Sequence, residues 1–77
     1  MDELQRLVTE LEMSVLCEVT GHDASTAAMW AEQLVDEAFA EQPRLLLLRI
    51  YIDEIEKKAT RARDLRDKIE AVRQAII

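Results

Sequence analysis

The most regular part of this chain is residues 45–76, which read LLLLRIYIDEIEKKATRARDLRDKIEAVRQAI. Apolar residues recur here at steps of three and four, the spacing that places side chains on one face of an α-helix. This stripe consists of Leu45, Leu48, Ile52, Ile55, Ala59, Ala62, Leu65, Ile69, Val72 and Ile76. The pattern predicts one long helix over about residues 43–76 with a coiled-coil-like apolar seam. Two successive steps of three meet at Ala62, where the helix should be locally overwound.

Two shorter apolar stripes precede this segment and predict two shorter helices. The first helix covers about residues 2–19, and Gly21, which adopts a positive φ at little cost, should end it. The second covers about residues 24–41 and contains Trp30, the largest apolar side chain, which should anchor the core. Pro43 lacks an amide hydrogen and disfavours helical geometry in the residue before it. The second helix should therefore stop near Pro43, which suits the first turn of the third helix.

The chain is predicted to be one small all-α domain of residues 1–77, with three helices joined by short connections that make neighbours antiparallel. At about 1.5 Å per residue the third helix would be about 50 Å long and the others about 27 Å each. The shorter helices would leave the C-terminal part of the stripe in water. Burying each aliphatic side chain is worth roughly 1.5–3 kcal/mol, so we expect a second copy or a partner to complete the bundle.

Charge is distributed unevenly along the chain. Residues 1–43 contain ten acidic residues and one basic residue, a net charge of −9, whereas residues 44–77 contain nine basic and six acidic residues, a net charge of +3. The two halves can attract each other within one molecule or between copies. The basic residues of the second half are diluted by acids and have no aromatic residue among them, so we do not expect a nucleic-acid partner. The acids of the first half either form solvated helix faces or imitate a phosphate backbone.

Seven residues are candidates for partner binding. The start of the predicted third helix is apolar on almost every side, which fits either a buried central helix or a groove that receives a partner helix. The C-terminal part of the seam should be exposed and should hold a partner helix or a second copy. The candidates are Leu47, Ile50 and Tyr51 from the first region and Leu65, Ile69, Val72 and Ile76 from the second.

The sequence predicts no catalytic residues, no metal site and no cofactor. A structural zinc site needs four ligands, usually cysteine or histidine at recognised spacings, and the chain has only Cys17 and His22. We expect Cys17 to be a small packing residue and His22 to lie in a loop near a helix end. A phosphate-cradling glycine loop and a Ser-His-Asp arrangement are also missing from the sequence, so we do not expect an enzyme.

These features favour a non-enzymatic protein–protein interaction module, an adaptor or small chaperone that uses its apolar seam to bind a partner helix or itself, with a dimer as the expected assembly. One alternative is a small acidic inhibitor, of the phage anti-defence or regulator type, that blocks a basic nucleic-acid-binding cleft. Another is a purely structural homo-oligomerisation module. The single Cys17, the acidic start at Met1 and the lack of a long apolar run predict a cytoplasmic protein that does not enter a membrane.

Overall fold

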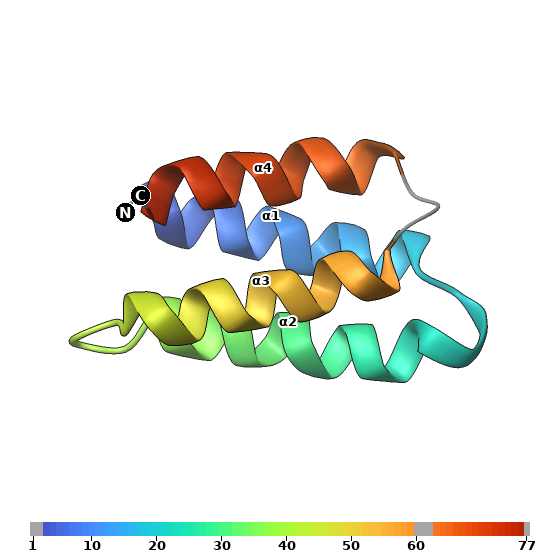
Figure 1. Ribbon diagram of the computed structural model, residues 1–77, viewed down its shortest axis with the longest axis horizontal. Coiled ribbons are helices and arrows are strands. Elements are labelled where there is room, and N and C mark those ends of the chain that lie inside the picture. The colour runs from blue at the N-terminus through green and yellow to red at the C-terminus, as the bar shows by residue number, and fades with distance from the viewer. Residues whose placement is uncertain (1–2, 60–62, 77) are drawn as a thin grey trace.

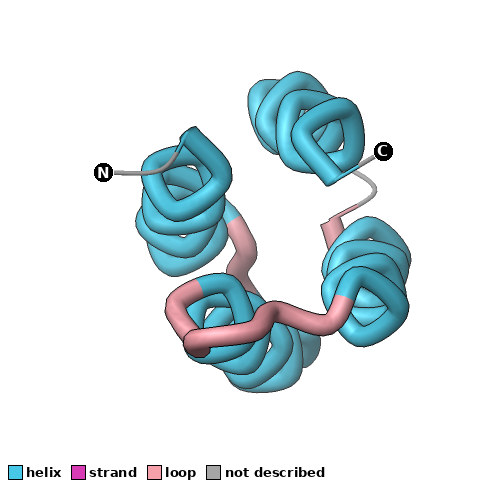
Figure 2. The backbone as a smooth tube through the Cα atoms, turned by 90° about the vertical axis from the view of Figure 1, so that its left-hand side faces the viewer, coloured by secondary structure: helices cyan, strands magenta, loops and turns pink. Residues whose placement is uncertain are grey.

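The computed structural model describes residues 3–59 and 63–76. These residues form four α-helices, α1 (Glu3–Glu18), α2 (Ala24–Ala38), α3 (Leu45–Lys58) and α4 (Arg63–Ile76), with a short 3-10 helix η1 (Gly21–Asp23) before α2. Successive helices run in opposite directions along the long axis of the molecule (Figure 1). Seen end-on, α1 and α3 each pack against both α2 and α4 (Figure 2). The fold is an antiparallel four-helix bundle.

The first two predicted helices are present as α1 and α2, although α2 ends at Ala38, earlier than predicted. Gly21 has a φ of 80° and separates the two helices, as its position in the sequence predicted. In the loop after α2, the backbone N–H of Arg44 donates to Oε2 of Glu37 at 2.9 Å. Because α3 begins at Leu45, Pro43 lies in this loop and not in the first helical turn.

The prediction of a single helix over residues 43–76 is wrong, because the structure has the two helices α3 and α4 there. α3 ends at Lys58, and Ala59 departs from helical geometry with a φ of −109° and a ψ of 31°. α4 then returns alongside α3 (Figures 1 and 2). The predicted overwound position, Ala62, lies outside the described residues. The reversal has a physical reason, because a continuous helix would hold the aliphatic side chains of its second half in water.

One apolar core lies between the four helices. The helices contain 16, 15, 14 and 14 residues, so the length mismatch predicted from the sequence is absent. Trp30 is half-buried and packs against this core from its side. The buried core residues are Val8, Leu11 and Val15 on α1, Ala27, Ala31, Leu34 and Ala38 on α2, Leu48, Ile52 and Ile55 on α3, and Leu65, Ile69, Val72 and Ile76 on α4, with Val19 and Ala59 just beyond helix ends.

The aliphatic stripe of α4 is part of this core, so the prediction that it is exposed is wrong. Leu65 and Val72 are 0% exposed, and Ile69 and Ile76 are 2% and 3% exposed. α4 packs against α1 and α3, which cover these side chains within the same chain. The fourth helix therefore fills the place that we had expected a second copy or a partner to take.

A cluster of ion pairs joins α3 to α4. The Arg73 guanidinium donates to both carboxylate oxygens of Glu56 at 2.9 Å and to Oδ1 of Asp53 at 2.7 Å. The side chain of Arg73 is 27% exposed, so these bonds are less screened by water than an ordinary surface ion pair. The hydrogen bonds from Arg73 lower the pKa of Glu56, and those to Glu56 and Asp53 raise the pKa of Arg73. The cluster fixes the position of α4 along α3.

Replacing Ile69 by alanine should destabilise the isolated protein, because this side chain is buried and its loss leaves a cavity. We expect the free energy of unfolding to fall by about 2–5 kcal/mol. Urea unfolding followed by circular dichroism and by the fluorescence of Trp30 measures this change. Gln74→Ala, an exposed change on the same helix, should alter stability by less than about 0.5 kcal/mol. Equal stability of Ile69→Ala and the unmodified protein would show that α4 does not pack on the core.

Replacing Arg73 by glutamine should lower the free energy of unfolding by about 1 kcal/mol at neutral pH, because Glu56 and Asp53 lose their partner. The pKa of Glu56 is lowered in the folded state from its ordinary value of 4.5. Its stabilising contribution is therefore complete above that value and is lost as the pH falls through the lower folded value.

The effect of Arg73→Gln should consequently shrink in acid, which urea unfolding at a series of pH values measures. Arg49→Gln, at an exposed position of α3, is the control and should have little effect at any pH. A loss for Arg73→Gln that is the same at neutral and at strongly acidic pH would contradict the role of the carboxylates.

Candidate functional site

The start of α3 exposes large aliphatic side chains. Leu46 and Ile50 lie one helical turn apart and are 71% and 42% exposed, on the side of α3 opposite to the fully buried Leu48. Leu45, directly before them, is 54% exposed. We call Leu45, Leu46 and Ile50 the α3 apolar face. Leu46 and Ile50 share one side of α3, whereas Leu45 lies about 100° around the helix from Leu46, nearer to the side of Leu48.

Charged residues bound the α3 apolar face. Arg49 and Asp53 are exposed beside it. One turn further along the helix, Lys57 Nζ forms an ion pair with Oε1 of Glu54 at 3.0 Å. The apolar surface is therefore confined to the first two turns of α3, and its edge is polar, which is the usual composition of a protein-binding patch.

The structure separates the seven residues that the sequence predicted for partner binding. Ile50 is exposed, whereas Leu47 and Tyr51 are half-buried. The ring of Tyr51 packs against that of Trp30 on α2, with ring centroids 5.8 Å apart. Tyr51 therefore joins α3 to α2 and presents only part of its surface. The remaining four candidates lie in the core and are inaccessible to a partner in this structure: Leu65, Ile69, Val72 and Ile76.

Leu45 and Leu46 were not among the predicted candidates, and four further exposed apolar residues were also missed by the sequence analysis. Met13 and Leu16 on α1 are 63% and 62% exposed, and Met29 on α2 and Phe39 directly after it are each 46% exposed. A signal for them exists in the sequence. They are large apolar residues outside the main helical stripes, so a helix that buries its stripe leaves them at the surface.

Three carboxylates of α1 and α2 influence one another electrostatically. Glu12 is half-buried, and its pKa is raised chiefly by this burial and further by the charges of Glu32 and Asp36. Within residues 3–59 and 63–76, none of the three carboxylates has an ion-pair partner. The acidic half of the sequence therefore produces a surface with uncompensated negative charge.

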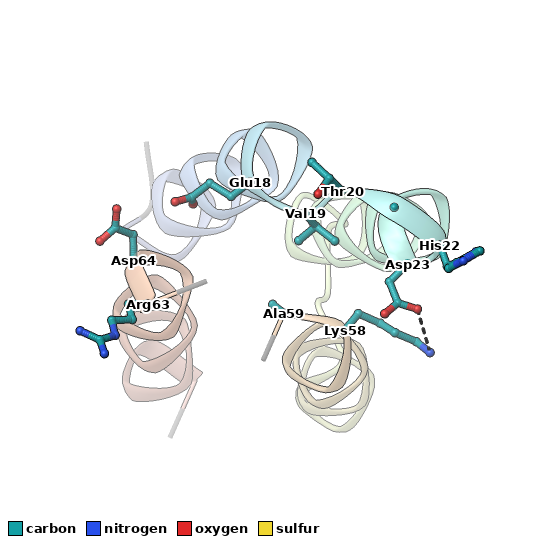
Figure 3. Close-up of a pocket in the computed structure, with 10 residues that line it drawn as sticks. Glu18, Val19, Thr20, His22, Asp23, Lys58, Ala59, Arg63 and Asp64 are labelled. Carbon is teal, nitrogen blue, oxygen red and sulfur yellow. Dashed lines mark ion pairs between the residues drawn. The ribbon is translucent and has the colours of Figure 1, made fainter. Parts of the chain in front are cut away.

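A cleft lies at the end of the bundle where α1 meets η1 and where α3 ends. Val19 and Ala59 line it between side chains of both charges (Figure 3). Lys58 Nζ approaches Oδ1 of Asp23 at 3.7 Å across one side. Other lining residues are Glu18, His22, Arg63 and Asp64. Because acids and bases are mixed around the cleft, its charge favours neither an anion nor a cation.

The described residues contain no group of three or more His, Cys, Asp or Glu side chains placed to hold a metal ion. His22 lies in η1, beyond the end of α1 as expected. Cys17 is exposed, so the prediction that it is a packing residue is wrong. In the part of the chain that the structure describes, every helix is too short or too polar to cross a membrane.

Comparison of this chain with models of known protein families, with curated proteins and with solved structures found no match. Its function therefore has to be inferred from the chemistry of its own surfaces. Two of these combine exposed apolar side chains with charged neighbours: the α3 apolar face, and the part of α1 and α2 around Leu16 and Glu12.

Replacing Glu12 by glutamine should stabilise the fold at neutral pH, because it removes a partly buried charge that Glu32 and Asp36 also repel. We expect a gain of about 0.2–0.5 kcal/mol in the free energy of unfolding. The folded-state pKa of Glu12 lies above its ordinary value of 4.5, so the penalty is present above the folded pKa and disappears as the pH falls below the ordinary value.

The gain from Glu12→Gln should therefore vanish in acid, which urea unfolding at neutral and acidic pH measures. Glu41→Gln is the matched control, since Glu41 is an exposed acid in the loop after α2. It should leave stability nearly unchanged. A variant Glu12→Gln that is less stable than the unmodified protein at neutral pH would show that burial and repulsion do not disfavour the Glu12 charge.

Proposed function

We propose that this protein is a non-enzymatic interaction module, an adaptor or small chaperone, that binds an amphipathic helix of another protein at the α3 apolar face. The observation that carries the proposal is the exposure of Leu46 and Ile50 on one side of α3, next to the exposed Leu45. A single exposed leucine is ordinary in a soluble protein. Leu46 and Ile50 are neighbours on the surface of α3, with the exposed Leu45 at the start of the same helix. Adjacent exposed apolar residues of this kind can mark an interaction site.

The energy available at this face is sufficient for binding. Full burial of one leucine or isoleucine side chain is worth roughly 1.5–3 kcal/mol. Leu46 is 71% exposed, so most of the burial free energy of its side chain is still available for binding. Burial of Leu45 and Ile50 would add to this free energy. The spacing of Leu46 and Ile50 by one turn matches the way in which packed helices contact each other. A partner helix with its own apolar stripe is the natural complement.

A different protein is favoured over a second copy because the face is short. It covers residues 45–50, about 9 Å of helix. A stable dimer usually buries about 800 Å² on each partner, more than two such short faces supply to each other. The expected dimer also rested on exposure of the α4 stripe, which lies in the core. A longer partner helix can extend from the α3 apolar face onto the half-buried Leu47 and Tyr51 beside it.

Replacing Leu46 by aspartate should weaken partner binding at least about tenfold, because binding would bury an unpaired carboxylate. Co-purification from the source cells, with mass measurement of the complex, identifies the partner, and a titration then measures its affinity. Leu16→Asp is the matched control, since Leu16 is an equally exposed leucine on α1. It should leave this binding unchanged.

Both variants alter exposed residues, so circular dichroism should show the same helix content in each. Equal binding by Leu46→Asp and the unmodified protein would contradict the proposal, as would equal loss in Leu46→Asp and Leu16→Asp. Sedimentation of the purified protein tests the alternative assembly, a homodimer formed through the α3 apolar face. A dimer that Leu46→Asp converts to monomers would identify the occupant of the face as a second copy, which corresponds to the homo-oligomerisation module.

A further inference from the structure

A second exposed apolar surface lies on α1 and α2, away from α3. Met13 and Leu16 are three residues apart on α1, so their side chains are neighbours, and they are 63% and 62% exposed. Met29 on the adjacent helix α2 is 46% exposed. Methionine is flexible and polarisable, and binding surfaces that accept varied apolar partners are rich in it.

The register of α1 against α2 brings these residues to one level of the bundle. α1 packs against α2. The charges of Glu32 and Asp36 on α2 contribute, after burial, to the raised pKa of Glu12 on α1. α1 and α2 are antiparallel (Figure 1), so one turn forward from Glu12 to Leu16 corresponds to one turn backward along α2. Met29 precedes Glu32 by three residues, about one turn. Leu16 therefore follows Glu12 on the face turned toward α2. We call Met13, Leu16 and Met29, together with Glu12, Glu32 and Asp36, the α1–α2 surface.

The charge beside these apolar residues is not compensated within the two helices. Arg6 is the only lysine or arginine in α1 and α2, and it is already paired with Glu3 and with Glu10, the latter at 3.0 Å. Glu32 and Asp36 are exposed and Glu12 is half-buried. Cationic groups of a partner would reduce the repulsion among these three carboxylates, and each cationic group could form a charge-assisted contact with one of them.

We propose that the α1–α2 surface is a docking site for a basic amphipathic helix of another protein. The apolar side of that helix would cover Leu16 and the two methionines, and its lysines and arginines would meet Glu12, Glu32 and Asp36. Charge complementarity selects this occupant. A second copy that presented the same face would be repelled, because residues 1–43 carry a net charge of −9. Nucleic acid and anionic membranes are repelled for the same reason.

This site is separate from the α3 apolar face. Seen along the bundle, α1 and α3 occupy diagonally opposite corners, and each contacts α2 and α4 (Figure 2). One molecule can therefore hold a partner on each side at the same time. The inference does not rest on the function proposed for α3, and either site can exist without the other.

The test uses a fluorescently labelled synthetic peptide with leucines at helical spacing and lysines at the other positions, together with a matched peptide that has glutamate in place of lysine. Fluorescence anisotropy measures the binding of each to the full-length protein. We expect the lysine peptide to bind and the glutamate peptide not to bind. Failure of the lysine peptide to bind, or equal binding of both peptides, would overturn the proposal.

Two variants locate the peptide on the protein. Leu16→Asp should weaken binding of the lysine peptide at least about tenfold, and Met29→Glu should do the same if Leu16→Asp fails to fold. Leu46→Asp should leave peptide binding unchanged. A loss caused by Leu46→Asp and not by Leu16→Asp would place the peptide on the α3 apolar face and would overturn this inference while leaving the function proposed for that face intact.

Two variants with the same change in net charge distinguish binding at the α1–α2 surface from general attraction between a basic peptide and an acidic protein. Glu32→Lys and Glu41→Lys change the net charge equally, but only Glu32 belongs to the α1–α2 surface. Glu32→Lys should weaken binding about tenfold and reduce its dependence on salt, and Glu41→Lys should have a much smaller effect. Equal effects of the two changes would show that the peptide is attracted by net charge alone, and the proposed site would be rejected.

Discussion

The fold depends on burial of the aliphatic stripe of α4 between α1 and α3. Leu65, Ile69, Val72 and Ile76 together represent several times the roughly 1.5–3 kcal/mol gained from burying one such side chain. That sum is comparable with the net stability of a small domain, about 5–15 kcal/mol. The chain can gain this energy alone only if it reverses direction after α3. Arg73 then adds what the apolar contact does not supply, a directional link that sets the position of α4 along α3.

The sequence predicted the helical class, the first two helices and, apart from the exposed Leu45, the buried positions within the described part of residues 45–76. It did so because an apolar stripe records which side of its helix is buried. It did not predict the reversal between α3 and α4. Apolar steps of three and four are the same whether one long helix faces a partner or two short antiparallel helices face a common core. Gly21 and Pro43 marked the first two connections, and no glycine or proline marks the third. The compressed step at Ala62 was the one irregularity visible in the stripe, and it predicted overwinding of a continuous helix.

The prediction of one long helix in place of α3 and α4 also limited how much of the site could be predicted. A residue on the stripe is available to a partner only if the chain itself leaves the stripe uncovered, and this depends on the tertiary arrangement. Once α4 closes the bundle, the residues left at the surface are large apolar side chains outside the stripes, such as Leu46, Leu16 and Met29. Ile50 was predicted because the start of α3 is apolar on nearly every side. The α1–α2 surface was not predicted, since the packing of α1 on α2, which brings Glu12 under the influence of Glu32 and Asp36, is a tertiary property.

The even number of helices has a consequence for engineering. α1 starts and α4 ends at the same end of the molecule, on neighbouring helices (Figures 1 and 2). A short linker between these two points would close the chain into a ring without crossing the core, and new ends opened in the loop between α2 and α3 would give a circular permutant. The same geometry lets the bundle be inserted into a surface loop of a host protein. In such a fusion the α3 apolar face and the α1–α2 surface would both remain accessible, because the host would be attached only at the end of the bundle where α1 starts and α4 ends.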